Sequence, residues 1–170
     1  MYRGMAVVVM AVGFAVVVTG TGAAFRGGRT VASGHWSGGG WTLTASDASD
    51  GRYCIKFTVR SQVYGNGCGS LDRPRGIGVL FHPGVPLPDF VAGAVVGRAS
   101  VVEITLSNGA TVRTPAIAPP IGLASNIRFY ATQIPCPTQP RAWVARNPAG
   151  QIVAHYTIGP PRRMPGHLSC

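Results

Sequence analysis

The sequence predicts an all-β protein, an antiparallel two-sheet sandwich that is immunoglobulin-like in architecture and follows an N-terminal hydrophobic signal or anchor helix. Stretches of alternating apolar and polar residues recur at roughly 10-residue intervals, which is typical of short strands. Gly (24) and Pro (14) are abundant among the 170 residues, as expected of a chain with many turns. The spacing of these stretches predicts about seven to nine strands. No amphipathic helical pattern follows the N-terminal run, in keeping with an all-β fold.

The chain begins with an apolar, uncharged run at residues 5–18, preceded by Arg3. Its length fits the hydrophobic region of an export signal, and the small residues Gly22 and Ala24 fit a cleavage site before Phe25. The uncharged stretch extends to Phe25, however, which is long enough to span a bilayer if it is not cut. Both alternatives place the folded domain outside the cytoplasm, either secreted or anchored to the cytoplasmic membrane.

Four segments are therefore expected. Residues 1–25 form the signal peptide or membrane anchor, and residues 26–40, with their GG, SG and GGG sequences, form a flexible linker without a fold. Residues 41–158 form the sandwich domain. Residues 159–170 form a C-terminal tail rich in Pro and Arg.

Within the sandwich domain, the first strand is expected at residues 41–46. A second strand at residues 52–60 places Tyr53, Ile55, Phe57 and Val59 on one face, so Cys54 points outward. Asn66-Gly67 indicates a turn in a Gly-rich loop at residues 65–69. Further strands and hairpins are expected at residues 76–81, 90–96, 99–114, 126–132 and 141–157.

Residues 99–114 give the clearest structural signal, a hairpin around Asn108-Gly109. A two-residue loop would place Val112 on the polar face. A three-residue loop with a left-handed Gly109 instead pairs Ile104 with Val112 and Glu103 with Arg113, leaving one face apolar. Burial of Val112 is worth about 1.5–3 kcal/mol, more than the roughly 0.2–1 kcal/mol of a cross-strand pair, so we expect the three-residue loop.

The last hairpin, residues 141–157, turns at residues 147–150, where Gly150 suits a left-handed conformation. Counting outward from this turn pairs Trp143 with His155 on one face. We interpret that pair as packing and not as catalysis.

Four cysteines in an exported chain predict disulfides before metal ligands, and none of their spacings is C-x-x-C. Of the three possible connectivities, we expect Cys54 with Cys68 and Cys136 with Cys170, because neighbours in sequence close the shortest loops. Each bridge would stabilise the fold by about 3–4 kcal/mol.

The chain carries 15 Lys and Arg against 5 Asp and Glu, a net charge of +10. Arg52, Lys56 and Arg60 have even spacing on one predicted strand, so they would form a basic stripe on its outer face. The stripe could contact an anionic lipid or an acidic envelope polymer. The alternative is a solvated face whose charges prevent edge pairing. Nucleic acid is not expected as a partner, since export removes the chain from most of it.

No motif for catalysis, for a cofactor or for a metal ion is present. We therefore expect a non-catalytic module with a binding or structural role at the cell envelope. The alternative, an envelope-directed hydrolase, would require distant loops to bring carboxylates together, and the available ones beside Glu103 are Asp47, Asp50, Asp72 and Asp89.

Three stretches of the second half carry a resemblance: VVEITLSNGATV (residues 101–112), RFYATQIP (128–135) and WVARNPAGQIV (143–153). They resemble a group of uncharacterised exported β-sandwich proteins of high-GC bacteria. The resemblance covers residues 92–154. It implies an exported β-sandwich, and it carries over no catalytic residue.

Overall fold

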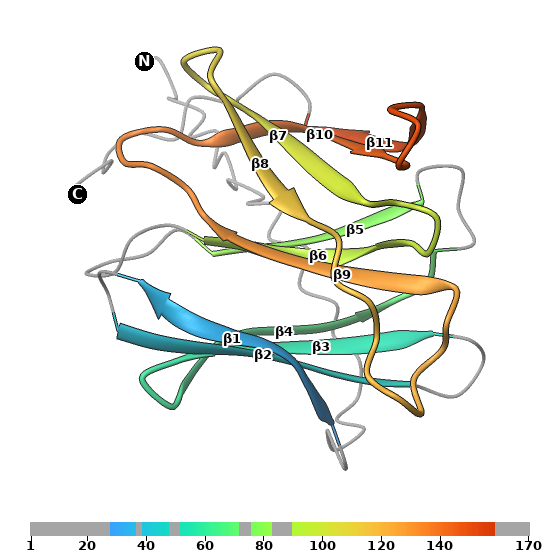
Figure 1. Ribbon diagram of the computed structural model, residues 1–170. Helices are drawn as coiled ribbons and strands as arrows, with labels where there is room; N and C mark the ends of the chain where they lie inside the picture. The colour runs from blue at the N-terminus through green and yellow to red at the C-terminus, as the bar shows by residue number, and fades with distance from the viewer. Residues whose placement is uncertain (1–27, 37–38, 48–51, 72–75, 83–89, 159–170) are drawn as a thin grey trace, which may run out of the picture.

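The computed structural model describes residues 28–36, 39–47, 52–71, 76–82 and 90–158, which form eleven strands (Figure 1). In chain order these are β1 (Arg29–Trp36), β2 (Gly39–Asp47), β3 (Tyr53–Val59), β4 (Gln62–Gly69), β5 (Ile77–His82), β6 (Phe90–Val96), β7 (Val101–Leu106), β8 (Thr111–Pro115), β9 (Ile127–Gln133), β10 (Pro140–Arg146) and β11 (Ile152–Thr157). The described residues contain no helix, so no helix long and apolar enough to cross a membrane is found among them. The predicted signal or anchor (1–25) and tail (159–170) lie outside the described residues.

The strands form three antiparallel sheets stacked as three layers (Figure 1). Sheet A has the order β1-β2-β3-β4, sheet B the order β5-β6-β9, and sheet C the order β11-β10-β7-β8. Sheet B lies between the other two. The all-β antiparallel sandwich is thus confirmed, but the two-sheet, immunoglobulin-like arrangement is wrong because a third sheet is present.

The sequence of β6 explains the third layer. FVAGAVV contains no polar residue, and all its positions except Val96 are buried, as expected of a strand covered on both faces. Phe90, Ala92 and Ala94 face sheet A, whereas Val91 and Val95 face sheet C. The core between sheets A and B consists of Leu43, Ala45, Tyr53, Ile55, Phe57, Val59, Phe90, Ala92, Ala94, Ile127 and Phe129.

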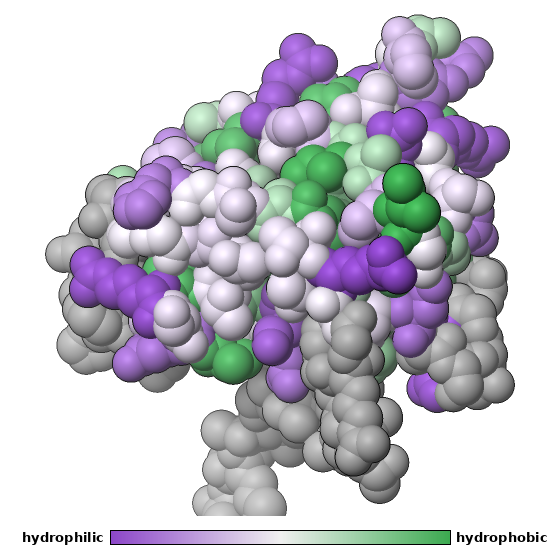
Figure 2. All heavy atoms as spheres, turned by 60° about the horizontal axis from the view of Figure 1, so that its bottom comes forward, coloured by the Kyte–Doolittle hydropathy of each residue, from purple (hydrophilic) through white to green (hydrophobic). Residues whose placement is uncertain are grey.

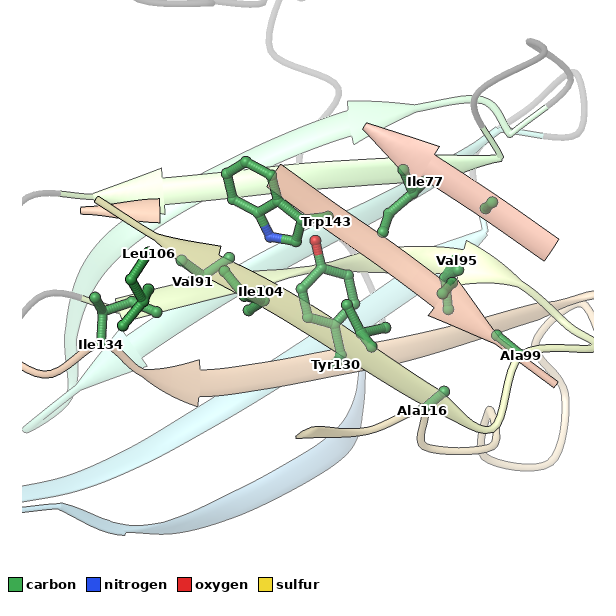
Figure 3. Packing of buried hydrophobic residues seen from close by; sticks show 13 residues of the cluster. Ile77, Val91, Val95, Ala99, Ile104, Leu106, Ala116, Tyr130, Ile134 and Trp143 are labelled. Atoms are coloured by element: carbon green, nitrogen blue, oxygen red, sulfur yellow. The ribbon is translucent and has the colours of Figure 1, made fainter. Parts of the chain in front are cut away.

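The second core lies between sheets B and C, with Tyr130 and Trp143 in its middle (Figure 3). Its buried residues are Ile77, Val91, Val95, Ala99, Val102, Ile104, Leu106, Ala116, Tyr130, Ile134, Trp143, Ala145 and Ala154. The Tyr130 hydroxyl crosses β6 and donates a hydrogen bond to the Gly78 carbonyl of β5 at 3.0 Å. Gly93 allows this crossing, because a side chain there would collide with the phenol. Tyr130 therefore joins all three strands of the middle sheet.

The predicted register of the β7–β8 hairpin is confirmed. Ile104 pairs with Val112 and Glu103 with Arg113. The Leu106 amide donates to the Ala110 carbonyl at 2.8 Å, and Gly109 has a φ of 83°. Glu103 also accepts a hydrogen bond from Arg146 of β10 at 2.8 Å, so one carboxylate links three strands of sheet C.

The predicted turn of the β10–β11 hairpin is confirmed, but its register is wrong by one residue. Gly150 has a φ of 79°. Trp143 lies opposite Tyr156, with ring centroids 5.5 Å apart, and His155 lies opposite Val144. The cause is a bulge between Ala145 and Arg146 of β10, which shifts the pairing beyond it.

Residues 26–40 are not a linker without a fold, since β1 and the start of β2 fall within them. The glycines that suggest flexibility instead permit close packing: the ring of Trp41 lies against Gly34, where a Cβ would come within 2.9 Å of the indole nitrogen. Val31 and Trp36 add apolar surface to the core between sheets A and B. Among the described residues, the folded part therefore already includes β1, ahead of the predicted start near Trp41.

Residues 65–69 are also a strand, β4, and not a Gly-rich loop. Gly65, Gly67 and Gly69 pair with the core-facing residues Phe57, Ile55 and Tyr53 of β3, so they lie on the inner face. At Gly65 a Cβ would come within 3.0 Å of Leu80 of β5. Gly65 thus lets the edge of sheet A approach β5, the edge of sheet B.

Candidate functional site

The outer face of sheet A is rich in hydroxyl groups. Leu43, Ala45 and Phe57 point into the core, so their neighbours along β2 and β3 point away from it. The outward positions carry Ser33, His35, Thr42, Thr44, Ser46, Lys56, Thr58 and Asn66. Among the described residues, no carboxylate shares this face. The basic side chains of this face are therefore not offset by a carboxylate of the described residues, which favours the approach of anions.

Figure 2 brings this lower sheet forward. Much of the visible surface there has intermediate hydropathy, as hydroxyl-bearing and small residues have, and strongly hydrophilic side chains stand near its edges. Thr44 and Thr58 donate to backbone carbonyls of the neighbouring strands at 3.3 Å, which fixes their hydroxyls on the sheet. Hydrogen bonds between β2 and β3 thus fix the orientation of these two side chains on the outer face.

A shallow depression of about 490 Å³ lies at the end of sheet A where β1 meets β2 and β3 meets β4. Arg60 and His35 are the basic side chains at its border, and both are exposed. Its full lining is Ser33, Gly34, His35, Gly40, Trp41, Thr42, Thr58, Arg60 and Ser61. Its hydroxyl, imidazole and guanidinium groups suit a hydrogen-bonding, negatively charged ligand.

The β3–β4 turn places Arg60 at this depression. Arg60 and Ser61 have φ angles of 48° and 66°, the left-handed pair expected of a two-residue type I′ turn. The Arg60 amide donates to the Gly40 carbonyl at 2.8 Å, which ties the turn to β2. Gly39 leaves room for the Arg60 side chain, because a Cβ there would come within 2.8 Å of it.

Aromatic rings support the depression from inside the sandwich. Trp41 stacks on Trp36 at a centroid distance of 4.8 Å and on Phe57 at 5.7 Å. Phe57 in turn stacks on Phe90 of sheet B at 4.1 Å. The indole nitrogen of Trp41 is buried without a hydrogen-bond partner in the structure. These stacked rings fix the position of β1 and β2 beneath the depression.

The structure divides the predicted basic stripe. Arg52 precedes β3 at one end, Lys56 lies half-buried in the middle of the outer face, and Arg60 lies in the turn at the other end. The expectation that Arg60 continues the strand is wrong, since β3 ends at Val59. The three positions extend over about 26 Å at the strand spacing. Only Arg60 reaches the depression.

The site residues that the sequence did not indicate are Ser33, His35, Thr42 and Thr58. Ser33 and His35 were assigned to a linker because of the glycines around them. A usable signal was present, since Gly34 and Trp36 alternate with Ser33 and His35 in the way that strand residues do.

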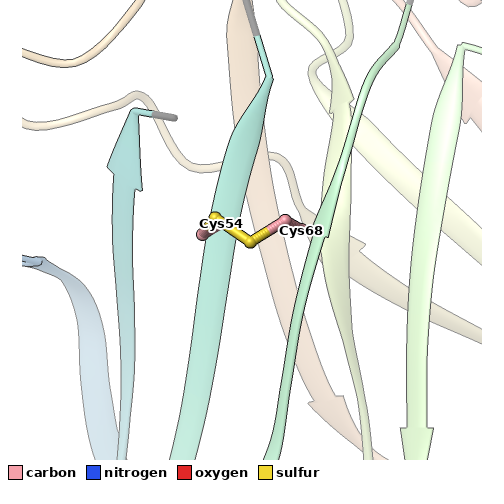
Figure 4. Close-up of a disulfide and its surroundings, with 2 residues drawn as sticks. All are labelled: Cys54 and Cys68. Atoms are coloured by element: carbon pink, nitrogen blue, oxygen red, sulfur yellow. A yellow bond between two sulfur atoms is a disulfide. The ribbon is translucent and has the colours of Figure 1, made fainter. Parts of the chain in front are cut away.

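The Cys54–Cys68 disulfide is confirmed and joins directly opposed residues of β3 and β4 (Figure 4). Cys54 lies on the predicted outer face but is 7% exposed, so it is covered and not open to solvent. A disulfide is typical of proteins that fold in an oxidising compartment, which fits a position outside the cytoplasm. Cys170 lies outside the described residues, so its pairing with Cys136 stays a prediction.

Removal of this disulfide should destabilise the fold. We expect the Cys54→Ala/Cys68→Ala variant to lose about 3 kcal/mol of unfolding free energy, because the bridge closes a loop with a sequence separation of 14. Urea unfolding monitored by tryptophan fluorescence measures the loss, with the oxidised native chain as the reference. Identical unfolding curves for the two proteins would contradict this expectation.

The described acidic residues have structural partners. Glu103 binds Arg113 and Arg146, and Asp47 accepts a hydrogen bond from the Ala124 amide at 3.3 Å. Asp50, Asp72 and Asp89 lie outside the described residues. Within the described part of the chain, no three His, Cys, Asp or Glu side chains are grouped as a metal site would require.

Comparison with known proteins gives no further guide to the site. No protein-family model, no curated protein and no solved structure matches this chain.

Proposed function

We propose that this chain is a non-catalytic binding module of the cell envelope, located outside the cytoplasm, that contacts an acidic polymer through the outer face of sheet A. One observation carries the proposal: Arg60 and His35 border a hydroxyl-lined depression on a face where the described residues include no carboxylate. A carboxylate or phosphate group of a polymer can accept hydrogen bonds from the Arg60 guanidinium and from the exposed Ser33 and Ser61 hydroxyls together.

The shape of the face favours a polymer over a lipid surface. Val63 is the large apolar residue exposed on the described outer face of sheet A, at 59%. Membrane binding of a peripheral face requires apolar side chains that enter the headgroup region in addition to charges. A long, shallow, polar face instead offers several weak contacts to successive units of a chain, and such contacts reinforce one another.

The test is a binding titration with polygalacturonate, a polyanionic polysaccharide, and with neutral dextran as the reference. We expect the protein to bind polygalacturonate and not dextran. Salt should weaken this binding, because the contacts are exposed. Arg60→Gln should lower the affinity about 5-fold, which corresponds to about 1 kcal/mol.

Arg98→Gln is the matched control, since Arg98 is an exposed residue of the turn between β6 and β7 and its replacement changes the net charge equally. We expect this variant to bind as the native protein does. Equal losses in both variants would indicate a response to net charge only and would overturn the assignment of the site. Sedimentation with phosphatidylglycerol vesicles tests the lipid alternative, in which Arg60→Gln would reduce vesicle binding.

A further inference from the structure

The connection between β8 and β9 exposes an isoleucine at its tip. Ile121 is 92% exposed, the most exposed large hydrophobic residue in the described part of the chain. It follows Pro119-Pro120 and precedes Gly122, which has a φ of 89°. The Leu123 amide donates to the Pro120 carbonyl at 3.1 Å, so a hydrogen-bonded turn presents Ile121 to solvent.

The same loop is fastened to sheet A at the start of β1. The Ala124 amide donates to an Asp47 carboxylate oxygen at 3.3 Å. Gly122 lies against the Arg29 guanidinium, where a Cβ would come within 2.9 Å of a guanidinium nitrogen. Figure 1 shows the loop descending past sheet B to the end of sheet A where β1 begins. An exposed apolar side chain thus stands beside a basic one.

The sequence before β1 indicates that a lipid surface can lie close to this end of sheet A. The uncharged apolar stretch ends at Phe25, four residues before Arg29. Four residues reach about 14 Å at most when fully extended. If residues 5–25 remain in a bilayer, the lipid surface therefore lies within reach of Arg29 and Ile121. An apolar residue next to a cation is the combination that binds at the boundary between headgroups and acyl chains.

We propose that residues 5–25 stay in the membrane and that Ile121 and Arg29 form a membrane-contacting end of the domain, with Ile121 entering the lipid headgroup region. The depression at Arg60 lies at the opposite end of sheet A, because β1 runs from Arg29 at one end to Trp36 at the other. The sheet then extends away from the bilayer and presents the depression to the surrounding envelope. This orientation rests on contacts separate from those of the polymer site.

An environment-sensitive label tests the orientation. Ile121→Cys, modified with a nitrobenzoxadiazole group after folding, is placed in the full chain in vesicles of phosphatidylcholine and phosphatidylglycerol. The matched control is Val63→Cys with the same label, since Val63 is 59% exposed on β4 near the opposite end of sheet A. Both positions are exposed, so neither substitution removes core packing.

We expect the label at position 121 to emit at shorter wavelength than the label at position 63. Nitroxide-bearing lipids should also quench it several-fold more strongly. Equal, water-like emission from both labels in vesicle-bound protein would overturn the proposal. Loss of residues 5–25 in the mature protein, seen by N-terminal sequencing together with failure to float with the vesicles, would also overturn it.

Discussion

We expect Gly93→Ala to lower the free energy of unfolding by about 3 kcal/mol, the upper range for extra volume in a packed interior. A Cβ at Gly93 would lie 2.5 Å from the Tyr130 hydroxyl and would also contact the Gly78 carbonyl. Neither group can retreat, because the Tyr130 hydroxyl donates to that carbonyl within the middle sheet. Denaturant unfolding followed by circular dichroism measures the loss.

Gly67→Ala is the matched control, since a Cβ at Gly67 meets no atom within 4 Å. Alanine loses less backbone entropy on folding than glycine, so this variant should be as stable as the native protein or more stable by up to about 1 kcal/mol. A Gly93→Ala protein as stable as Gly67→Ala would show that sheet B is not packed between two layers in the way described.

The second large effect is a loss of stability in alkali. Burial raises the pKa of Tyr53 to about 12. Burial, and to a smaller extent the neighbouring Tyr53 and Tyr156, raise the pKa of Tyr130 well above its ordinary value. Both phenols are neutral in the folded protein and ionise more readily in the unfolded chain. Their stabilising effect is therefore complete below about pH 10 and declines as the pH rises toward 12 and beyond.

For Tyr53, the difference in pKa between the folded and the unfolded chain corresponds to about 3 kcal/mol of unfolding free energy. Urea unfolding at a series of pH values from 8 to 12 should show a midpoint that is steady at first and then falls. In Tyr53→Phe the fall should be smaller, because one of the two ionisable phenols is missing. A midpoint that stays constant to pH 12 would contradict the burial of these hydroxyls.

The local sequence pattern was sufficient to predict features that depend on a single pair of neighbouring strands. In the β7–β8 hairpin, alternation and the Asn108-Gly109 turn fixed a register that the structure reproduces. The Cys54–Cys68 bridge was predictable because its partners are close in sequence, with a separation of 14. Both features depend on contacts between segments that are close in sequence.

The third layer could not be read from local pattern, because alternation tells which residues share a face but not what covers that face. The apolar run of β6 was the available signal for a strand buried on both sides. Glycines misled the assignment of β1 and β4, since Gly34 and Gly65 serve close packing and not flexibility. The glycines around β1 also concealed two residues of the candidate site, Ser33 and His35.

The position of Arg60 also could not be predicted from local pattern. Even spacing placed Arg60 on a strand, whereas the chain turns there with left-handed Arg60 and Ser61. Type I′ turns usually contain Asn, Asp or Gly, so the sequence Arg60-Ser61 did not indicate a turn. The structure leaves Arg60 near one end of sheet A and Arg52 near the other, which separates the depression from the end proposed to meet the membrane.

The central claim, that the depression on sheet A is the binding site, is tested most directly by mapping amide chemical shifts during titration with oligogalacturonate. We predict that the largest changes occur at Ser33, His35, Thr42, Thr58 and Arg60, with none at Glu103 and Arg113 of sheet C. Changes centred on sheet C or on the loop around Ile121, or no changes with excess oligogalacturonate, would contradict the claim.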